Sequence, residues 1–60
     1  MENKFKAARL KAGLSAYEAA RRLGVTHPAL YMWETGRSKP NAENLLKIAA
    51  LYGCKPEKLL

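Results

Sequence analysis

The side chains of this 60-residue chain that can do acid–base or metal chemistry are few and scattered. There is one histidine, His27, and one cysteine, Cys54, and the 5 acidic residues do not cluster. General acid–base catalysis needs a base held beside a second titratable group, and a metal ion needs several His, Cys or carboxylate ligands together. The sequence therefore predicts a protein that is not an enzyme and that uses no cofactor and no metal.

Basic side chains are numerous and can bind an anionic partner. Lysine and arginine number 11 against 5 acidic residues, a net charge of +6. Such an excess favours a polyanionic partner. An excess of one sign also keeps a small domain soluble, so both interpretations of the charge stay open.

The single cysteine and the hydropathy of the chain indicate where the protein works. One cysteine forms no disulfide within the chain, which favours a reduced, cytoplasmic setting. Cys54 follows Gly53 at the end of an apolar run, which favours a buried thiol over a reactive one. No signal-peptide pattern begins the chain, and no apolar run reaches the roughly 18 residues that a membrane span needs. We expect a cytoplasmic protein without membrane contact.

Capping residues and glycines divide the chain into five predicted helices, and no segment alternates as a strand would. The helices are expected over residues 4–12, 16–23, 27–35, 42–52 and 56–60. Each of the first four follows a capping residue, namely Asn3, Ser15, Thr26 and Asn41. Ser15 also stands three residues before Glu18, the spacing of a capping box. We expect an all-α fold, a compact five-helix bundle, with residues 1–60 as one domain.

Each of the first four predicted helices carries an apolar face at helical spacing. The expected inward residues are Phe5, Ala8 and Ala12, then Ala19, Ala20 and Leu23, then Leu30 and Trp33, and finally Leu45, Ile48, Ala49 and Tyr52.

Residues 15–36 have the pattern of two short helices joined by a tight turn, a helix-turn-helix. Ala20 permits a close approach of the helices, and Gly24 can form the turn. Val25, Leu30 and Trp33 hold the second helix in place. An ordinary helical hairpin is the alternative explanation of the small residues, but it does not explain the polar and aromatic side chains on the outside of residues 27–35. The pattern predicts a helix for the major groove of DNA.

Four motifs extend this pattern over nearly the whole chain. They are GLS (Gly13–Ser15), AxxLGVT (Ala20–Thr26), WETGRxKP (Trp33–Pro40) and NLLKIAxxYG (Asn44–Gly53). With them, residues 5–60 resemble the Cro and phage-repressor family of helix-turn-helix domains. The resemblance implies a lambda-repressor-like bundle that binds double-stranded operator DNA, commonly as a homodimer, and regulates transcription. We expect a repressor.

The resemblance also implies which residues read the bases. By position, His27, Pro28 and Met32 match the base-reading sites, with Ala29 and Tyr31 beside them. None of these side chains carries the amide or guanidinium fork that pairs with purine edges. We therefore expect reading through methyl contacts and DNA shape. Plain exposure remains the alternative for His27, and packing or a protein contact for Tyr31 and Met32.

Phosphate contacts are expected on both sides of the reading helix. The candidates are Ser15, Ala16 and Tyr17 at the start of one helix, and Arg37, Ser38 and Lys39 in the loop after the other. The family often has Gln in place of Ala16, so a side-chain contact is lost there, and the Tyr17 hydroxyl can replace it. A solvated role is preferred for Lys4, Lys6, Lys11, Arg21 and Arg22.

The resemblance implies one structural ion pair and a dimer contact. Arg9 and Glu34 match the positions of a pair that fixes the reading helix on the bundle. The apolar patch for a dimer is expected from Leu51, Leu59, Leu60 and Tyr52. Completion of the core is the alternative for Leu59 and Leu60.

A protein-interaction module is the alternative function. The same fold can serve an antitoxin or an adaptor that docks an acidic protein partner. The run Tyr31–Trp33 and the lack of Gln, Asn or Arg at the reading positions favour it.

Overall fold

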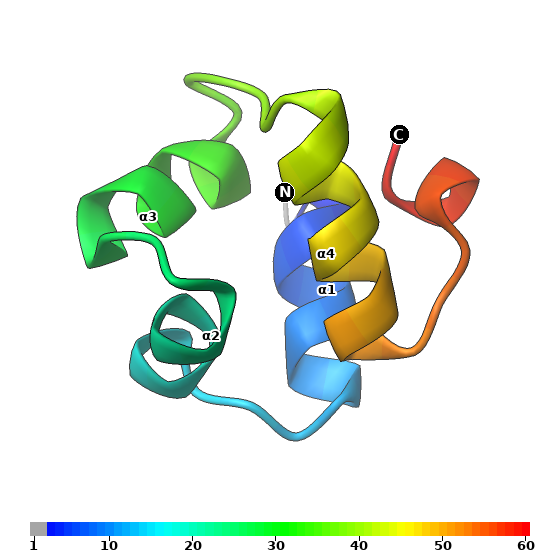
Figure 1. Ribbon diagram of the computed structural model, residues 1–60, viewed down its shortest axis with the longest axis horizontal. Coiled ribbons are helices and arrows are strands. Elements are labelled where there is room, and N and C mark those ends of the chain that lie inside the picture. The colour runs from blue at the N-terminus through cyan, green and yellow to red at the C-terminus, as the bar shows by residue number, and fades with distance from the viewer. Residues whose placement is uncertain (1–2) are drawn as a thin grey trace.

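The computed structural model of the protein describes residues 3–60. Within them, four α-helices precede one 3-10 helix: α1 (Lys4–Lys11), α2 (Ala16–Leu23), α3 (His27–Thr35), α4 (Ala42–Tyr52) and η1 (Pro56–Leu59). Figure 1 shows α2 and α3 together on one side, α1 and α4 in the middle, and η1 on the other side. Because no described residue is in a strand, the all-α prediction is confirmed for this part of the chain.

The prediction of five helices is wrong in its last member, and two predicted bounds are too long. η1 is a 3-10 helix of 4 residues that ends at Leu59, and the Lys58 N–H donates to the Lys55 carbonyl at 2.9 Å. With only 4 residues, the segment forms one tight turn of the 3-10 type, which is common for such short pieces. α1 ends at Lys11, and Ala12 is its exposed C-cap residue rather than part of an apolar face.

The predicted caps form at the N-terminal ends of the α-helices. In each case the cap's side-chain oxygen accepts a hydrogen bond from a backbone N–H three residues later: Asn3, Ser15, Thr26 and Asn41. The Ser15 Oγ accepts from the Glu18 N–H at 3.0 Å. The Glu18 carboxylate does not turn back to complete a capping box, because it accepts from Arg21 at 2.6 Å and from Arg22 at 2.7 Å.

The turn between α2 and α3 depends on one glycine. Gly24 has φ 72°, in the left-handed region that most side chains avoid. This conformation lets the Val25 N–H donate to the Ala20 carbonyl at 3.1 Å, which closes the end of α2. Thr26 then begins α3 by accepting from the Ala29 N–H at 3.2 Å. Three residues therefore separate the two helices.

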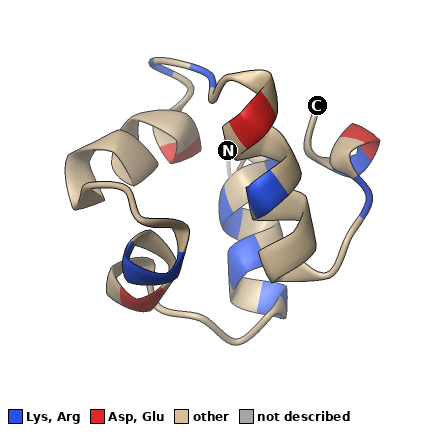
Figure 2. Ribbon diagram, viewed as in Figure 1, with Lys and Arg blue, Asp and Glu red and all other residues tan. Residues whose placement is uncertain are grey.

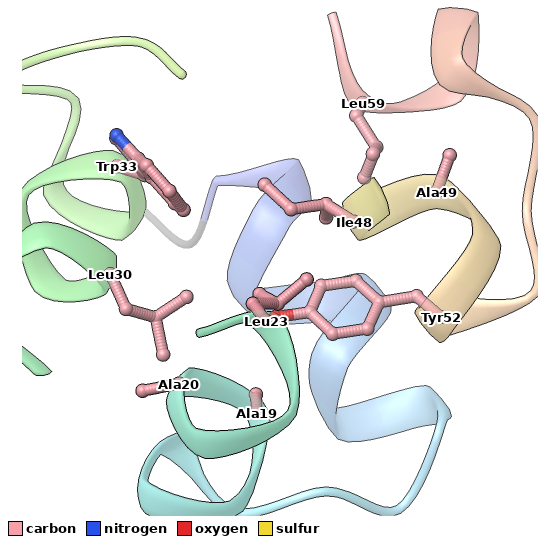
Figure 3. Packing of buried hydrophobic residues seen from close by; sticks show 9 residues of the cluster. All are labelled: Ala19, Ala20, Leu23, Leu30, Trp33, Ile48, Ala49, Tyr52 and Leu59. Atoms are coloured by element: carbon pink, nitrogen blue, oxygen red, sulfur yellow. The ribbon is translucent and has the colours of Figure 1, made fainter. Parts of the chain in front are cut away.

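The core lies where α2, α3, α4 and η1 meet (Figure 3). Its buried apolar residues are Ala19, Ala20, Leu23, Leu30, Trp33, Ile48, Ala49, Tyr52 and Leu59. Leu30 and Ile48 are the largest side chains that are fully buried. Phe5, Ala8, Val25, Leu45 and the half-buried Cys54 pack around this cluster.

Two residues expected in a dimer patch are part of the core instead. Tyr52 and Leu59 are only 8% and 3% exposed, because α4 and η1 turn them toward the interior. Leu60 is 72% exposed, and Leu51 is half-buried. The surface that remains of the predicted patch is therefore small.

No helix in residues 3–60 combines the length and the apolar character that crossing a membrane requires.

Candidate nucleic-acid interface

Helix α3 divides its side chains between the core and the outside. Leu30 and Trp33, three residues apart, are buried. His27, Pro28, Tyr31 and Met32 are exposed, and Ala29 is half-buried. The outer surface of α3 therefore presents an imidazole, a phenol, a thioether and a proline ring. All five residues predicted to read bases lie on one helix, and four of them are exposed.

A buried ion pair attaches the C-terminal half of α3 to α1. The Arg9 Nε lies 2.7 Å from Glu34 Oε2, and its Nη2 donates to Oε1 at 3.1 Å. The remaining Nη1 donates to the Leu14 carbonyl at 3.0 Å. The two side chains are 8% and 9% exposed. The structure thus brings the predicted pair together with fork-to-fork geometry, which fixes direction as well as distance.

The electrostatics of this pair favour the charged arginine. The hydrogen bonds to Glu34 hold the pKa of Arg9 above its ordinary value, while burial acts in the opposite direction. The Tyr52 hydroxyl is buried and has no hydrogen-bond partner among the described residues. Burial raises the pKa of Tyr52 to about 12; the charge of Glu34 adds to this rise, and Arg9 opposes it.

Asn3 makes a second connection to α3 that the sequence analysis missed. Its Oδ1 accepts from the Lys6 N–H at 3.1 Å and caps α1. Its Nδ2 donates to the Trp33 carbonyl at 2.7 Å. An asparagine cap has a donor as well as an acceptor, whereas an aspartate cap has acceptors alone. The asparagine at position 3 was therefore the available sign of a second hydrogen bond. Together with the Thr26 cap, these contacts hold α3 at both ends.

The predicted phosphate-binding residues flank α3 on two sides. Ser15 and Tyr17 are exposed at the start of α2, whereas Ala16 is half-buried. After α3, Arg37 and Lys39 are exposed and Ser38 is half-buried. The N–H groups of Arg37 and Ser38 donate to the Met32 carbonyl at 2.9 and 3.3 Å and cap the C-terminal end of α3. The cations of the loop therefore follow directly after the end of α3.

A groove of about 670 Å³ runs between α1, the start of α2 and α3. Ala16 and Tyr31 line it, and so does the exposed Lys6 of α1. The sequence analysis placed Lys6 on a solvated face. The sequence held no signal for this position, because the groove forms only when α1 packs against the helix-turn-helix.

The helix-turn-helix itself carries no net charge. Residues 15–36 contain two arginines and two glutamates. Glu18 forms salt bridges with Arg21 and Arg22. The hydrogen bond from Arg22 has the largest effect on the pKa of Glu18, and together with the bond from Arg21 it holds that pKa below its ordinary value. Figure 2 shows α3 almost entirely uncharged, with basic residues in the loop that follows it and along α1. The uncharged surface of α3 thus lies between cations supplied by neighbouring elements.

Comparison with known proteins agrees with this geometry. The helix-turn-helix family matches residues 5–59, and the chain belongs to this family, in its Cro and phage-repressor type. The chain is similar to Repressor protein C2 of Salmonella phage P22, with 32% identity over 60 residues. The match includes 100% of this chain but 28% of that repressor, so the chain spans just over a quarter of its relative's length. No solved structure gave a significant match.

Proposed function

We propose that the chain binds double-stranded DNA in a sequence-specific manner as part of a transcriptional repressor, with α3 in the major groove. The observation that carries the proposal is the exposed, uncharged surface of α3, which is fixed by a buried ion pair and bordered by cations. At about 1.5 Å per residue, the 9 residues of α3 span roughly 14 Å, comparable with a groove about 12 Å wide. The family match and the similarity to a phage repressor support it.

Base reading is assigned to the outer residues of α3. His27, at the N-terminal end of the helix, can donate one hydrogen bond to a base edge or accept one from it. Pro28, Ala29 and Met32 offer apolar surface to thymine methyl groups, and Tyr31 lies beside them. Because these side chains have no bidentate donors, DNA shape is expected to supply part of the specificity.

Phosphate contacts are assigned to both flanks of α3. One set comprises Ser15, Ala16 and Tyr17, and the other comprises Arg37, Ser38 and Lys39. Lys6 joins the first set, because it lines the groove that also contains Ala16 and Tyr31. It supplies a cation near the position where the family often has a glutamine.

A homodimer is proposed for specific binding. One α3 offers few base contacts, and a two-fold pair reads half-sites about 34 Å apart. The exposed Leu60 and the half-buried Leu51 are the part of the predicted patch that can meet a second copy.

The dependence of affinity on salt tests the proposal directly. Log affinity for a random duplex should fall steeply as log salt rises, because each neutralised phosphate releases counterions. Arg37→Ala should weaken binding to every sequence and reduce the slope by about one. Lys47→Ala is the matched control, because Lys47 is an exposed lysine that pairs with Glu43 on α4. A flat response to salt in the unaltered protein would overturn the proposal.

A protein-interaction module is the second candidate. The observation that favours it is the exposure of Tyr31 and Met32, 56% and 41%, on a surface without charge. An antitoxin or adaptor of this fold would bind a protein through that surface. It would show no salt-dependent affinity for random duplex, so the same titration separates the two functions.

A further inference from the structure

Much of the positive charge of this protein lies outside the helix-turn-helix. Helix α1 contains Lys4, Lys6, Arg9 and Lys11, and the C-terminal segment adds Lys55 and Lys58. These six residues are more than half of the 11 basic residues in the chain. Only Arg9 and Lys6 among them belong to the arrangement around α3 described above. The remaining lysines need another explanation.

These four lysines surround one groove between α1 and the C-terminal segment. The groove has a volume of about 990 Å³ and contains Lys4, Lys11, Lys55 and Lys58. Ala7, Ala8 and Cys54 give it an apolar floor, and Glu57 is its single acidic residue. Residues 4, 7, 8 and 11 follow one another along one face of α1. A basic rim therefore encloses a floor of small apolar side chains.

Among residues 3–60, no salt bridge to an acidic side chain involves the four lysines of this groove. The Lys4 Nζ donates to a backbone oxygen of Leu60 at 2.6 Å. The salt bridges found among residues 3–60 involve Arg9, Arg21, Arg22 and Lys47. Lys11, Lys55 and Lys58 are exposed. Their charges are thus available to an anionic ligand.

Apart from Lys4, which also lines a hollow beside Trp33 and Lys39, the groove is on the side of the molecule away from α3. Figure 1 shows α3 and η1 on opposite sides of α1 and α4, and the molecule measures 24 × 23 × 21 Å. A straight duplex seated on α3 does not reach the far side. The ligand of this groove is therefore a different molecule.

We propose that this groove binds an acidic, extended segment of a partner protein. Its carboxylates would lie against the lysine rim, and small aliphatic side chains between them would pack on Ala7, Ala8 and Cys54. Lys4 and Lys11 are about 10.5 Å apart along the helix axis, at about 1.5 Å per residue. Three residue steps of extended chain, at about 3.3 Å each, span nearly that distance.

The lining favours polypeptide over single-stranded nucleic acid. Binding of unpaired bases relies on aromatic side chains or arginine for stacking, and neither lines the groove. Lysine is a compact point charge that pairs with carboxylates as well as with phosphates, so the absence of stacking side chains from the lining decides between them. The inference goes beyond the proposed function and does not rest on it, because it concerns another face of the molecule.

An NMR titration of the whole chain tests the inference. The probe is a ten-residue peptide of alternating Asp and Val, and the comparison probe alternates Asp and Gly with the same charge. The Asp-Val peptide should shift the amides of Ala7, Ala8 and residues 54–58 and leave those of α3 in place. It should bind several-fold more tightly than the Asp-Gly peptide, because only valine uses the apolar floor.

Charge variants complete the test. Lys11→Gln with Lys58→Gln should weaken the Asp-Val peptide about fivefold, since each exposed charge contributes a few tenths to about 1 kcal/mol. Lys39→Gln with Lys47→Gln removes the same charge elsewhere and should change the affinity less than twofold. The inference is overturned by no binding at millimolar peptide, by shifts confined to α3, or by equal losses in both double variants. Tighter binding of a ten-residue oligo-dT in this groove would also overturn it.

Discussion

At the scale of single residues, the Arg9–Glu34 pair matters most for holding α3. Both side chains are less than a tenth exposed, so removing one leaves the other charged and buried. Glu34→Gln is expected to lower the free energy of unfolding by about 3 kcal/mol, measured by urea denaturation. That is a large part of the total stability of roughly 3–9 kcal/mol expected for a chain of this size.

The exposed pair on α4 gives the matched control for this prediction. Glu43 is 78% exposed and lies 3.7 Å from Lys47. Glu43→Gln should change the stability by less than about 0.5 kcal/mol. If Glu34→Gln proved as mild as Glu43→Gln, the ion pair would not be what fixes α3 on the bundle.

Tyr52 gives a second prediction at this scale, because its hydroxyl is buried and has no hydrogen-bond partner within residues 3–60. Tyr52→Phe should leave the stability at pH 7 unchanged or raise it by up to about 1 kcal/mol. The pKa of Tyr52 in the folded protein is about 12, against an ordinary value near 10. The folded state therefore keeps its proton where the unfolded state has lost it, and stability falls as the pH rises from about 10 to 12.

Denaturation of the unaltered protein and of Tyr52→Phe between pH 9 and pH 11.5 checks this prediction. The decrease in stability above pH 10 should be smaller in the variant. Identical curves for both proteins would show that Tyr52 ionises equally in the folded and unfolded states.

The sequence predicts individual residues well where the reason is local. The caps Asn3, Ser15, Thr26 and Asn41 form because each sits directly before its own helix. The second bond of Asn3, to the Trp33 carbonyl, joins residues 30 apart in the chain and depends on how α1 packs. Positions such as Lys6 are undetermined by the sequence for the same reason.

At the scale of elements, the α2–α3 turn is the part most sensitive to backbone conformation. Gly24 has φ 72°, and a Cβ added there would meet no atom within 4 Å. The effect of a substitution is therefore backbone strain alone. Gly24→Ala should cost about 1–2 kcal/mol in chemical denaturation. Gly24→Asn should cost less, because asparagine tolerates the left-handed region. Equal costs for alanine and asparagine would contradict this explanation.

The α-helices were predictable because their start and stop signals are local. The 3-10 conformation of the segment after Gly53 was not predictable from the sequence. Caps and glycines give the bounds of α2, α3 and α4. For η1, the sequence offered one proline and two leucines, which do not distinguish an α-turn from a 3-10 turn. Packing against α4 and α1 buries Leu59 and determines where that segment lies.

At the scale of the whole molecule, the positive charge is distributed over two separate regions, one for each of the two proposed binding sites. A neutral helix-turn-helix is bordered by Lys6, Arg37 and Lys39, whereas four other lysines surround the α1–η1 groove. The net charge of +6 favoured an anionic partner but gave no location for its binding. The sequence indicates the class of protein, and the positions of its cations follow only from helix packing.

The central claim, that α3 reads base sequence, is tested most directly by selecting binding sites from a random duplex library. The unaltered protein, His27→Ala and Arg37→Ala are selected in parallel. The unaltered protein should enrich a defined motif, and for a dimer this motif repeats with two-fold symmetry about one helical turn apart. His27→Ala should change the motif at particular base pairs, whereas Arg37→Ala should keep the motif and bind it more weakly. No enriched motif, or one motif unchanged by His27→Ala, would contradict the reading of DNA by α3.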